Sequence, residues 1–270
     1  SLSVYNENDA RKRMEIIMHV ETRLARASLD KVKLRDPHAT YHKMAWGELT
    51  ELAPNFPWNA YAEGLAIQIP GDLIVTELEY IQEVMRILAD EPLENLKTYF
   101  EWDIISDSTG LLSQDFIDEN FRFSQALSGQ EVIKPQWRRS LNALNGSLGE
   151  LFGQLYVKKY FHESAKVKID TLVSDLFDAY EKRILTLVWL GAETKKRAVE
   201  KLRAMRRKIG YPAKWRSYAG LIVAPDDYYG NVERITTYEF RRNLNRLGTP
   251  VDREVWFTPP QTVNAYYNPV

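Results

Sequence analysis

Apolar residues recur every three or four positions along most of this chain, from Asp9 to about Gly210. This spacing matches the 3.6-residue turn of an α-helix and places the apolar side chains on one face of each helix. One clear example covers residues 137–160, and Pro135 stands just before it as a residue that suits the first turn of a helix. The periodicity therefore predicts a mainly helical fold.

The same pattern predicts helices on both sides of this segment. We expect Ser113 to be the N-cap of one of them, and Gly210 and Pro212 to end another whose inner face includes Leu202 and Met205, with Ala198 and Ile209. After Tyr218 the pattern gives way to a loop, one more helix and an extended end. The predicted helices cover residues 9–28, 77–106 (a stretch of helical pattern), 113–127, 164–190, 192–209 and 234–248.

Two glycines interrupt the helix predicted over residues 137–160. Gly149 and Gly153 are four residues apart, which places them on one face. Glycine lowers helix propensity, so its presence here indicates that another part of the molecule needs the space. We expect the backbone of another helix to approach at this point.

The charge balance argues against a nucleic-acid or membrane partner. The chain has 36 Lys and Arg against 37 Asp and Glu, and no apolar run approaches the roughly 20 residues that span a bilayer. An RNA-binding protein built on the basic stretch 195–208 is one alternative. Glu193 and Glu200 lie within or beside that stretch, however, which is typical of a solvated helix face.

The histidines do not form a metal site in this sequence. "YFHESAKVK" begins like the HExxH motif of a zinc peptidase with His162 and Glu163, but Lys166 occupies the second ligand position. We interpret these residues as the start of a helix, with His162 or Ser164 near the N-cap. His38 and His42 are also four residues apart, but no apolar helical stripe surrounds them. Cysteine is absent, which removes disulfides, thiolate zinc sites and Cys nucleophiles.

The C-terminal end predicts a strand without a partner. Pro259 and Pro260 lead into a β-branched and aromatic run, Thr262 to Tyr267, and an Asn-Pro turn signal follows at 268–269. An isolated strand leaves its backbone donors and acceptors unmatched. We therefore expect the sequence to continue or to pair with another chain, as a truncated piece or as one half of a polypeptide nicked after Val270.

These terminal residues carry a family resemblance. "TPPQTVNAYYNP" resembles the substrate-binding edge strand of the M13 (neprilysin-type) zinc metallopeptidases, whose signature reads V-N-A-F/Y-Y. Further segments resemble parts of the same family in the same order: "ETRLARAS", "LRDPHATYHKM", "LGELFGQLYVKKYF", "ETKKRAVEKL", "KIGYPAKWRSY" and "FRRNLNRLGTPVDREVW". The resemblance covers essentially the whole chain.

The resemblance implies a mainly α fold, the helical lobe of a two-lobed zincin-type metallopeptidase that ends in a short β edge strand of the catalytic lobe. Residues 1–230 would form the inserted, chamber-capping helical lobe, and residues 231–270 the return into the catalytic lobe. The HExxH segment, the third zinc ligand in an ExxxD segment and a downstream histidine and arginine would lie beyond Val270. Zinc would therefore be bound outside this chain, which alone should be inactive.

The resemblance also assigns substrate contact to Asn264 and Ala265. The Asn264 amide would bond the backbone of a peptide, and the main chain of the strand would pair with it, as in β-augmentation. Two departures from the family pattern are Phe257, where the family usually has Met, and "FHES", where relatives have a Pro-rich segment.

The resemblance thus predicts part of a zinc-dependent metalloendopeptidase that hydrolyses oligopeptides. Its partners would be the remaining catalytic portion of the same enzyme and peptide substrates, with no nucleic acid and no membrane contact by this segment. Family members are mostly extracytoplasmic, which favours a periplasmic, surface-anchored or secreted location, and a cytoplasmic location is the alternative that the sequence leaves open. The alternative is a non-catalytic helical domain that binds peptides or other proteins.

Overall fold

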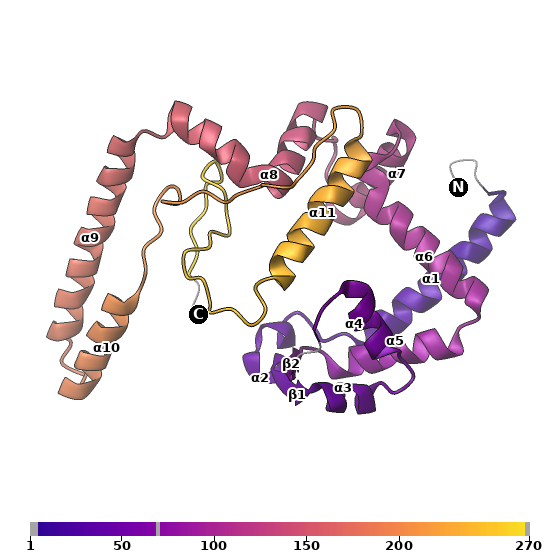
Figure 1. Cartoon of the computed structure of the whole chain (residues 1–270), viewed down its shortest axis with the longest axis horizontal. Coiled ribbons are helices and arrows are strands. Elements are labelled where there is room, and N and C mark those ends of the chain that lie inside the picture. Colours follow the sequence, from indigo (N-terminus) through magenta and orange to yellow (C-terminus); the bar gives the residue numbers. More distant parts are fainter. Residues whose placement is uncertain (1–4, 69–70, 268–270) are drawn as a thin grey trace. The chain divides into compact units, whose positions relative to one another are not determined.

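The computed structural model describes residues 5–68 and 71–267. Over these residues the chain forms eleven α-helices, two 3-10 helices and one two-stranded sheet, so the predicted helical fold is confirmed (Figure 1). The chain divides into two compact units, Ser1–Ile133 and Lys134–Val270. The Asn-Pro turn predicted at 268–269 and the predicted cut after Val270 lie outside the described residues.

Three long helices form the body of the first unit. Helix α1 contacts both α5 and α6, and Val20 of α1 and Ile87 of α5 are buried there. The side chain of Asn6 caps α1 by accepting a hydrogen bond from the Asp9 amide. Pro92 separates α5 from α6, because the residue before a proline disfavours helical angles. The helices are α1 (Glu7–Ala27), α5 (Leu78–Asp90) and α6 (Leu93–Ser108).

A small sheet and short helices complete this unit. Strand β1 pairs antiparallel with β2, with His42 opposite Val75. Leu49 and Ala62, on the helices that follow β1, are buried. Ser113 is the N-cap of α7, as predicted. The elements are η1 (Lys33–Arg35), α2 (Pro37–Thr40), β1 (His42–Ala45), α3 (Trp46–Leu52), α4 (Trp58–Leu65), β2 (Asp72–Val75), η2 (Thr109–Leu111) and α7 (Gln114–Ser128).

The second unit contains four helices and long irregular segments. Helix α10 lies beside α9, where an ion pair joins Arg203 to Glu181, and α11 contacts α8 (Figure 1). Helix α8 bends at Leu148, whose φ of −112° and ψ of 30° are not helical. The helices are α8 (Gln136–Tyr160), α9 (Glu163–Thr186), α10 (Ala192–Ala204) and α11 (Tyr228–Leu244).

Three of the predicted helices in this unit end early, and one of them, α11, which ends at Leu244 rather than residue 248, also begins early. Helix α9 ends at Thr186 rather than residue 190, and α10 ends at Ala204 rather than residue 209, so Met205 and Ile209 are not on its inner face. The residues after α10 have tertiary partners instead, since Arg206 pairs with Glu254. Helix α11 begins at Tyr228 rather than residue 234, because the Asp227 side chain caps it.

Within the described residues, no helix combines the length and the apolar character that crossing a membrane requires.

Candidate functional site

A tight turn precedes the predicted substrate residues. The Thr262 amide donates a hydrogen bond to the Pro259 carbonyl across 3.0 Å, which closes a β-turn with Pro260 at its second position. Proline suits that position because its ring fixes φ near the value the turn needs. The chain therefore enters the segment of Asn264 and Ala265 from a stiff turn.

Helix α8 holds this turn in a groove that two glycines create. Gly149 and Gly153 are the buried residues of α8, and Pro259 and Pro260 of the C-terminal segment lie against them. A Cβ atom on Gly149 would lie 3.0 Å from Pro259 Cγ, and one on Gly153 would lie 2.7 Å from Pro260 Cδ. The predicted approach of another helix backbone was wrong, since the glycines make room for two proline rings. We call the site formed by Gly149 and Gly153 the glycine groove.

A side-chain amide fastens the turn to the same helix. Gln261 Nε2 donates hydrogen bonds to Asn145 Oδ1 (2.8 Å) and to the Gly149 carbonyl (3.0 Å). These acceptors lie on either side of Leu148, where the helix bends and its hydrogen-bond ladder is disturbed. Gln261 Oε1 is buried and has no hydrogen-bond partner within the described chain.

Further contacts hold the stretch that leads to the turn. Lys208 Nζ donates to the Val255 carbonyl across 2.6 Å. The Phe257 amide donates to the Tyr266 hydroxyl across 3.3 Å, and the two rings meet edge to face with centroids 5.9 Å apart. Residues 257–266 therefore form a closed loop that is tied to the groove at one end.

Asn264 and Ala265 project from this loop into solvent. Both are exposed, and the Val263 side chain before them is fully exposed. Asn264 Oδ1 accepts a hydrogen bond from the Ala265 amide across 2.8 Å. Residues 262–267 pair with no strand among the described residues, so the predicted edge strand stays a prediction. Their exposed backbone groups are what a pairing peptide would need.

The structure places the histidines as the sequence suggested. His162 is the N-cap of α9, with Glu163 in the first turn, and Lys166 Nζ donates to the Tyr211 carbonyl across 2.9 Å. His42 Nδ1 lies 2.9 Å from the Val75 carbonyl oxygen. Over residues 5–68 and 71–267, no group of three or more His, Asp or Glu side chains could hold a metal ion. The described residues therefore do not fit a zinc site.

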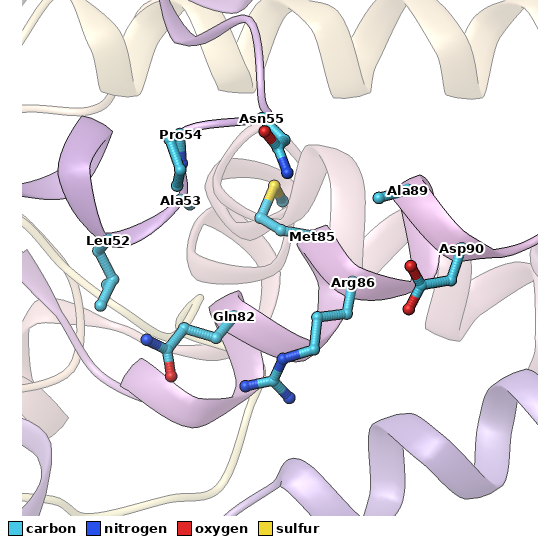
Figure 2. A pocket seen from close by; sticks show the side chains of 9 residues that line it. All are labelled: Leu52, Ala53, Pro54, Asn55, Gln82, Met85, Arg86, Ala89 and Asp90. Atoms are coloured by element: carbon cyan, nitrogen blue, oxygen red, sulfur yellow. The ribbon is translucent and has the colours of Figure 1, made fainter.

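The hollows of the described surface lie elsewhere in each unit. One of about 220 Å³ lies between the end of α3 and α5, where the Met85 sulfur and the Asn55 amide point toward each other (Figure 2). Arg86, on its rim, is engaged by Glu83 across 2.5 Å. Another of about 500 Å³ lies between α9 and α10. Glu181 and Arg203, which line it, form an ion pair with each other. Of the charged side chains that line the two hollows, only Asp178 has no ion pair among the described residues, and a single carboxylate does not select a ligand.

Comparison with known proteins identifies the family. Residues 1–212 match the family model described as Peptidase family M13. Neprilysin-3 of Drosophila melanogaster is 28% identical over 98% of this chain and 36% of its own length. Human endothelin-converting enzyme 1 is also 28% identical, again over 98% of this chain and 36% of its own length.

Solved structures agree with this match. The zinc metalloprotease Zmp1 of Mycobacterium tuberculosis, in its open state, is 35% identical with a TM-score of 0.88, over 98% of this chain and 42% of that protein. PepO of Lactobacillus rhamnosis has the same TM-score at 23% identity, over 98% of this chain and 42% of its own, which shows a shared fold. This chain therefore spans well under half the length of these relatives. On the strength of the family match, the chain belongs to peptidase family M13.

Proposed function

We propose that this chain is the chamber-capping helical lobe and the substrate-aligning segment of a zinc-dependent metalloendopeptidase that hydrolyses oligopeptides. Residues 1–230 form the lobe and residues 231–270 the return into the catalytic lobe. Family membership supports the reaction class, and the likeness to a solved zinc metalloprotease over 98% of the chain supports the lobe.

The observation that carries this proposal is the exposed segment beyond the glycine groove. Asn264 and Ala265 follow a fixed turn and present their backbone to solvent. A peptide would add to this edge through main-chain hydrogen bonds, which suits substrates of varied sequence. On binding, the Asn264 side chain would release the Ala265 amide and bond the peptide backbone instead. Substrate alignment is thus the role of these two residues.

In the complete enzyme, zinc would be held by residues outside this chain and would supply the activation of a water for attack on a peptide carbonyl. The partners of this chain are the remaining catalytic portion and peptides, and its location is extracytoplasmic. Nucleic acid and membrane are not partners of this segment. In support, basic residues of α10 have acidic neighbours: Arg197 pairs with Glu193 and Glu200.

The proposal is tested by Asn264→Ala in the complete enzyme that contains this chain. Loss of a hydrogen bond to substrate should raise KM and lower kcat/KM about 10-fold, because one such bond contributes about 1.5 kcal/mol when its partner stays unpaired. Asn243→Ala is the matched control: Asn243 is also an exposed asparagine but lies on α11, and its substitution should leave both constants unchanged. Equal kinetics for the two variants would contradict the role of Asn264.

A second measurement separates the catalytic proposal from the alternative. The 270-residue chain with added zinc should hydrolyse no peptide, whereas the complete enzyme should hydrolyse oligopeptides and hold zinc by elemental analysis. Peptide binding without hydrolysis by the complete, zinc-supplied polypeptide would instead favour a non-catalytic helical peptide-binding domain.

A further inference from the structure

Resting on the proposed function, we propose that Gly153 and Asn145 of α8, together with Gln261, are positioning residues for peptide hydrolysis. None of them is required to touch the peptide. They fix where the segment of Asn264 and Ala265 stands, and therefore where a bound peptide lies relative to the catalytic centre of the complete enzyme.

A side chain at position 153 would clash with the turn. Pro260 Cδ lies 2.7 Å from the position of a Cβ on Gly153, a separation that real Cβ atoms essentially never show. The atom on the other side belongs to a proline ring, which has no side-chain torsion through which it could move aside. An added methyl group must therefore displace the backbone of the turn, and the displacement continues toward Asn264.

The segment of Asn264 and Ala265 is held through the turn that precedes it. Among the described residues, the hydrogen bonds of residues 262–266 stay within the loop 257–266: Thr262 to Pro259, Ala265 to Asn264 and Phe257 to Tyr266. The bonds to α8 come from Gln261, three residues before Asn264. The contacts of Gln261 with α8 are thus the nearest ones that determine the position of Asn264.

The two glycines make room for the turn and do not stabilise α8 itself. Glycine within a helix is about 1 kcal/mol less favourable than alanine, so alanine at either glycine would favour the helical form of α8. If these glycines served only α8 itself, alanine would be harmless or stabilising. Their value lies in what they admit, which is the turn of Pro259 and Pro260.

The experiment compares two substitutions on one helix of the complete enzyme. Gly153→Ala places a methyl group against Pro260, whereas Gly146→Ala places one where no atom lies within 4 Å. We expect Gly153→Ala to lower kcat about 10-fold or more with little change in KM, because a displacement of about 1 Å can cost up to 100-fold in rate. Gly146→Ala should keep both constants, and thermal unfolding of both variants measures any accompanying loss of stability.

A second pair of variants tests the hydrogen bond and does not depend on the glycines. Asn145→Leu removes the acceptor of Gln261 Nε2, whereas Asn145→Asp keeps an oxygen at that place. Asn145→Leu should lower kcat about 5-fold, and Asn145→Asp should restore most of it. This pair carries the test if Gly153→Ala does not fold.

The outcomes distinguish the two proposals. If Asn264→Ala raises KM while Gly153→Ala and Asn145→Leu behave as their controls, the positioning role is overturned and substrate alignment stands. If Asn264→Ala also behaves as its control, the proposed substrate contact itself fails. A parallel loss of melting temperature and kcat across these variants, with no rescue by Asn145→Asp, would assign the residues a structural role only.

Discussion

Arg23 Nη1 donates a hydrogen bond to Glu91 Oε1 across 3.0 Å, which ties α1 to the residue that ends α5. Arg23 Nε also donates to Glu83 across 2.7 Å. The Glu91 side chain is only 8% exposed and accepts a further bond from Asn95. This network joins the helices that form the body of the first unit.

We expect Arg23→Met to lower the free energy of unfolding by about 2 kcal/mol, because two partly buried carboxylates lose the guanidinium that bonds to both, even though Glu83 keeps its pair with Arg86. Arg122→Met is the control. Arg122 pairs with Glu119 on the exposed face of α7, and loss of such a pair changes stability by about 0.5 kcal/mol or less. Urea unfolding of both variants measures the difference, and equal midpoints would show that the network adds no stability.

The same network predicts acid sensitivity. The Asn95 amide, helped by Arg23, holds the pKa of Glu91 below its ordinary value of 4.5, and Arg23 lowers the pKa of Glu83. A carboxyl whose pKa is lower in the folded state adds stability above the unfolded pKa and loses it as pH falls through the folded pKa. Unfolding free energy should therefore decline below about pH 4.5, and less steeply in Glu91→Gln. Identical profiles would argue against this assignment.

Gly210 should tolerate alanine poorly. Its φ is +71°, and a Cβ there would lie 2.6 Å from Phe161 Cε1. Gly220 has a φ of +86° but open space around its Cβ position. Gly220→Ala should cost about 1 kcal/mol from backbone strain alone, and Gly210→Ala about 2 kcal/mol or more, since the ring must also move. Thermal unfolding compares them, and equal losses would mean that Phe161 yields without cost.

The proposed main-chain recognition at Ala265 predicts a selective loss of activity when this residue is replaced by proline. Ala265→Pro removes the amide proton, whereas Ala265→Ser keeps it and adds only a hydroxyl group. In the complete enzyme, the proline variant should lose about 10-fold or more in kcat/KM, and the serine variant should stay near the parent. Tolerance of proline would place the pairing atoms elsewhere in the segment.

Local signals allowed most of the helices to be predicted. Helix α8 begins and ends within one residue of the prediction, because the signals that define it, its apolar stripe and Pro135, lie within or next to the helix and do not depend on distant residues. The end of α10 was missed because the following residues, such as Lys208, bond to groups more than 40 positions away. The sheet was missed as well, since each strand has only four residues and its partner is remote.

In the candidate site, too, sequence reasoning found some residues and missed those whose contacts are remote in the chain. Asn264 and Ala265 were predicted from the family signature, and no hydrogen-bond pattern in the sequence alone would have selected them. Gly149 and Gly153 did indicate a close approach, but the spacing of two glycines says nothing about what approaches. Asn145 was missed because its partner, Gln261, is 116 positions away and neither residue has a distinctive neighbourhood in sequence.

Because the turn at Pro259 and Pro260 is fixed, the number of residues after it sets the position of Asn264. Asn264 lies three positions after Gln261, and in extended chain each residue advances about 3.3 Å and reverses the side on which its side chain points. One inserted residue would therefore carry Asn264 forward and turn it to the opposite face. Length, more than side-chain identity, is what evolution or an engineer must preserve between these two positions.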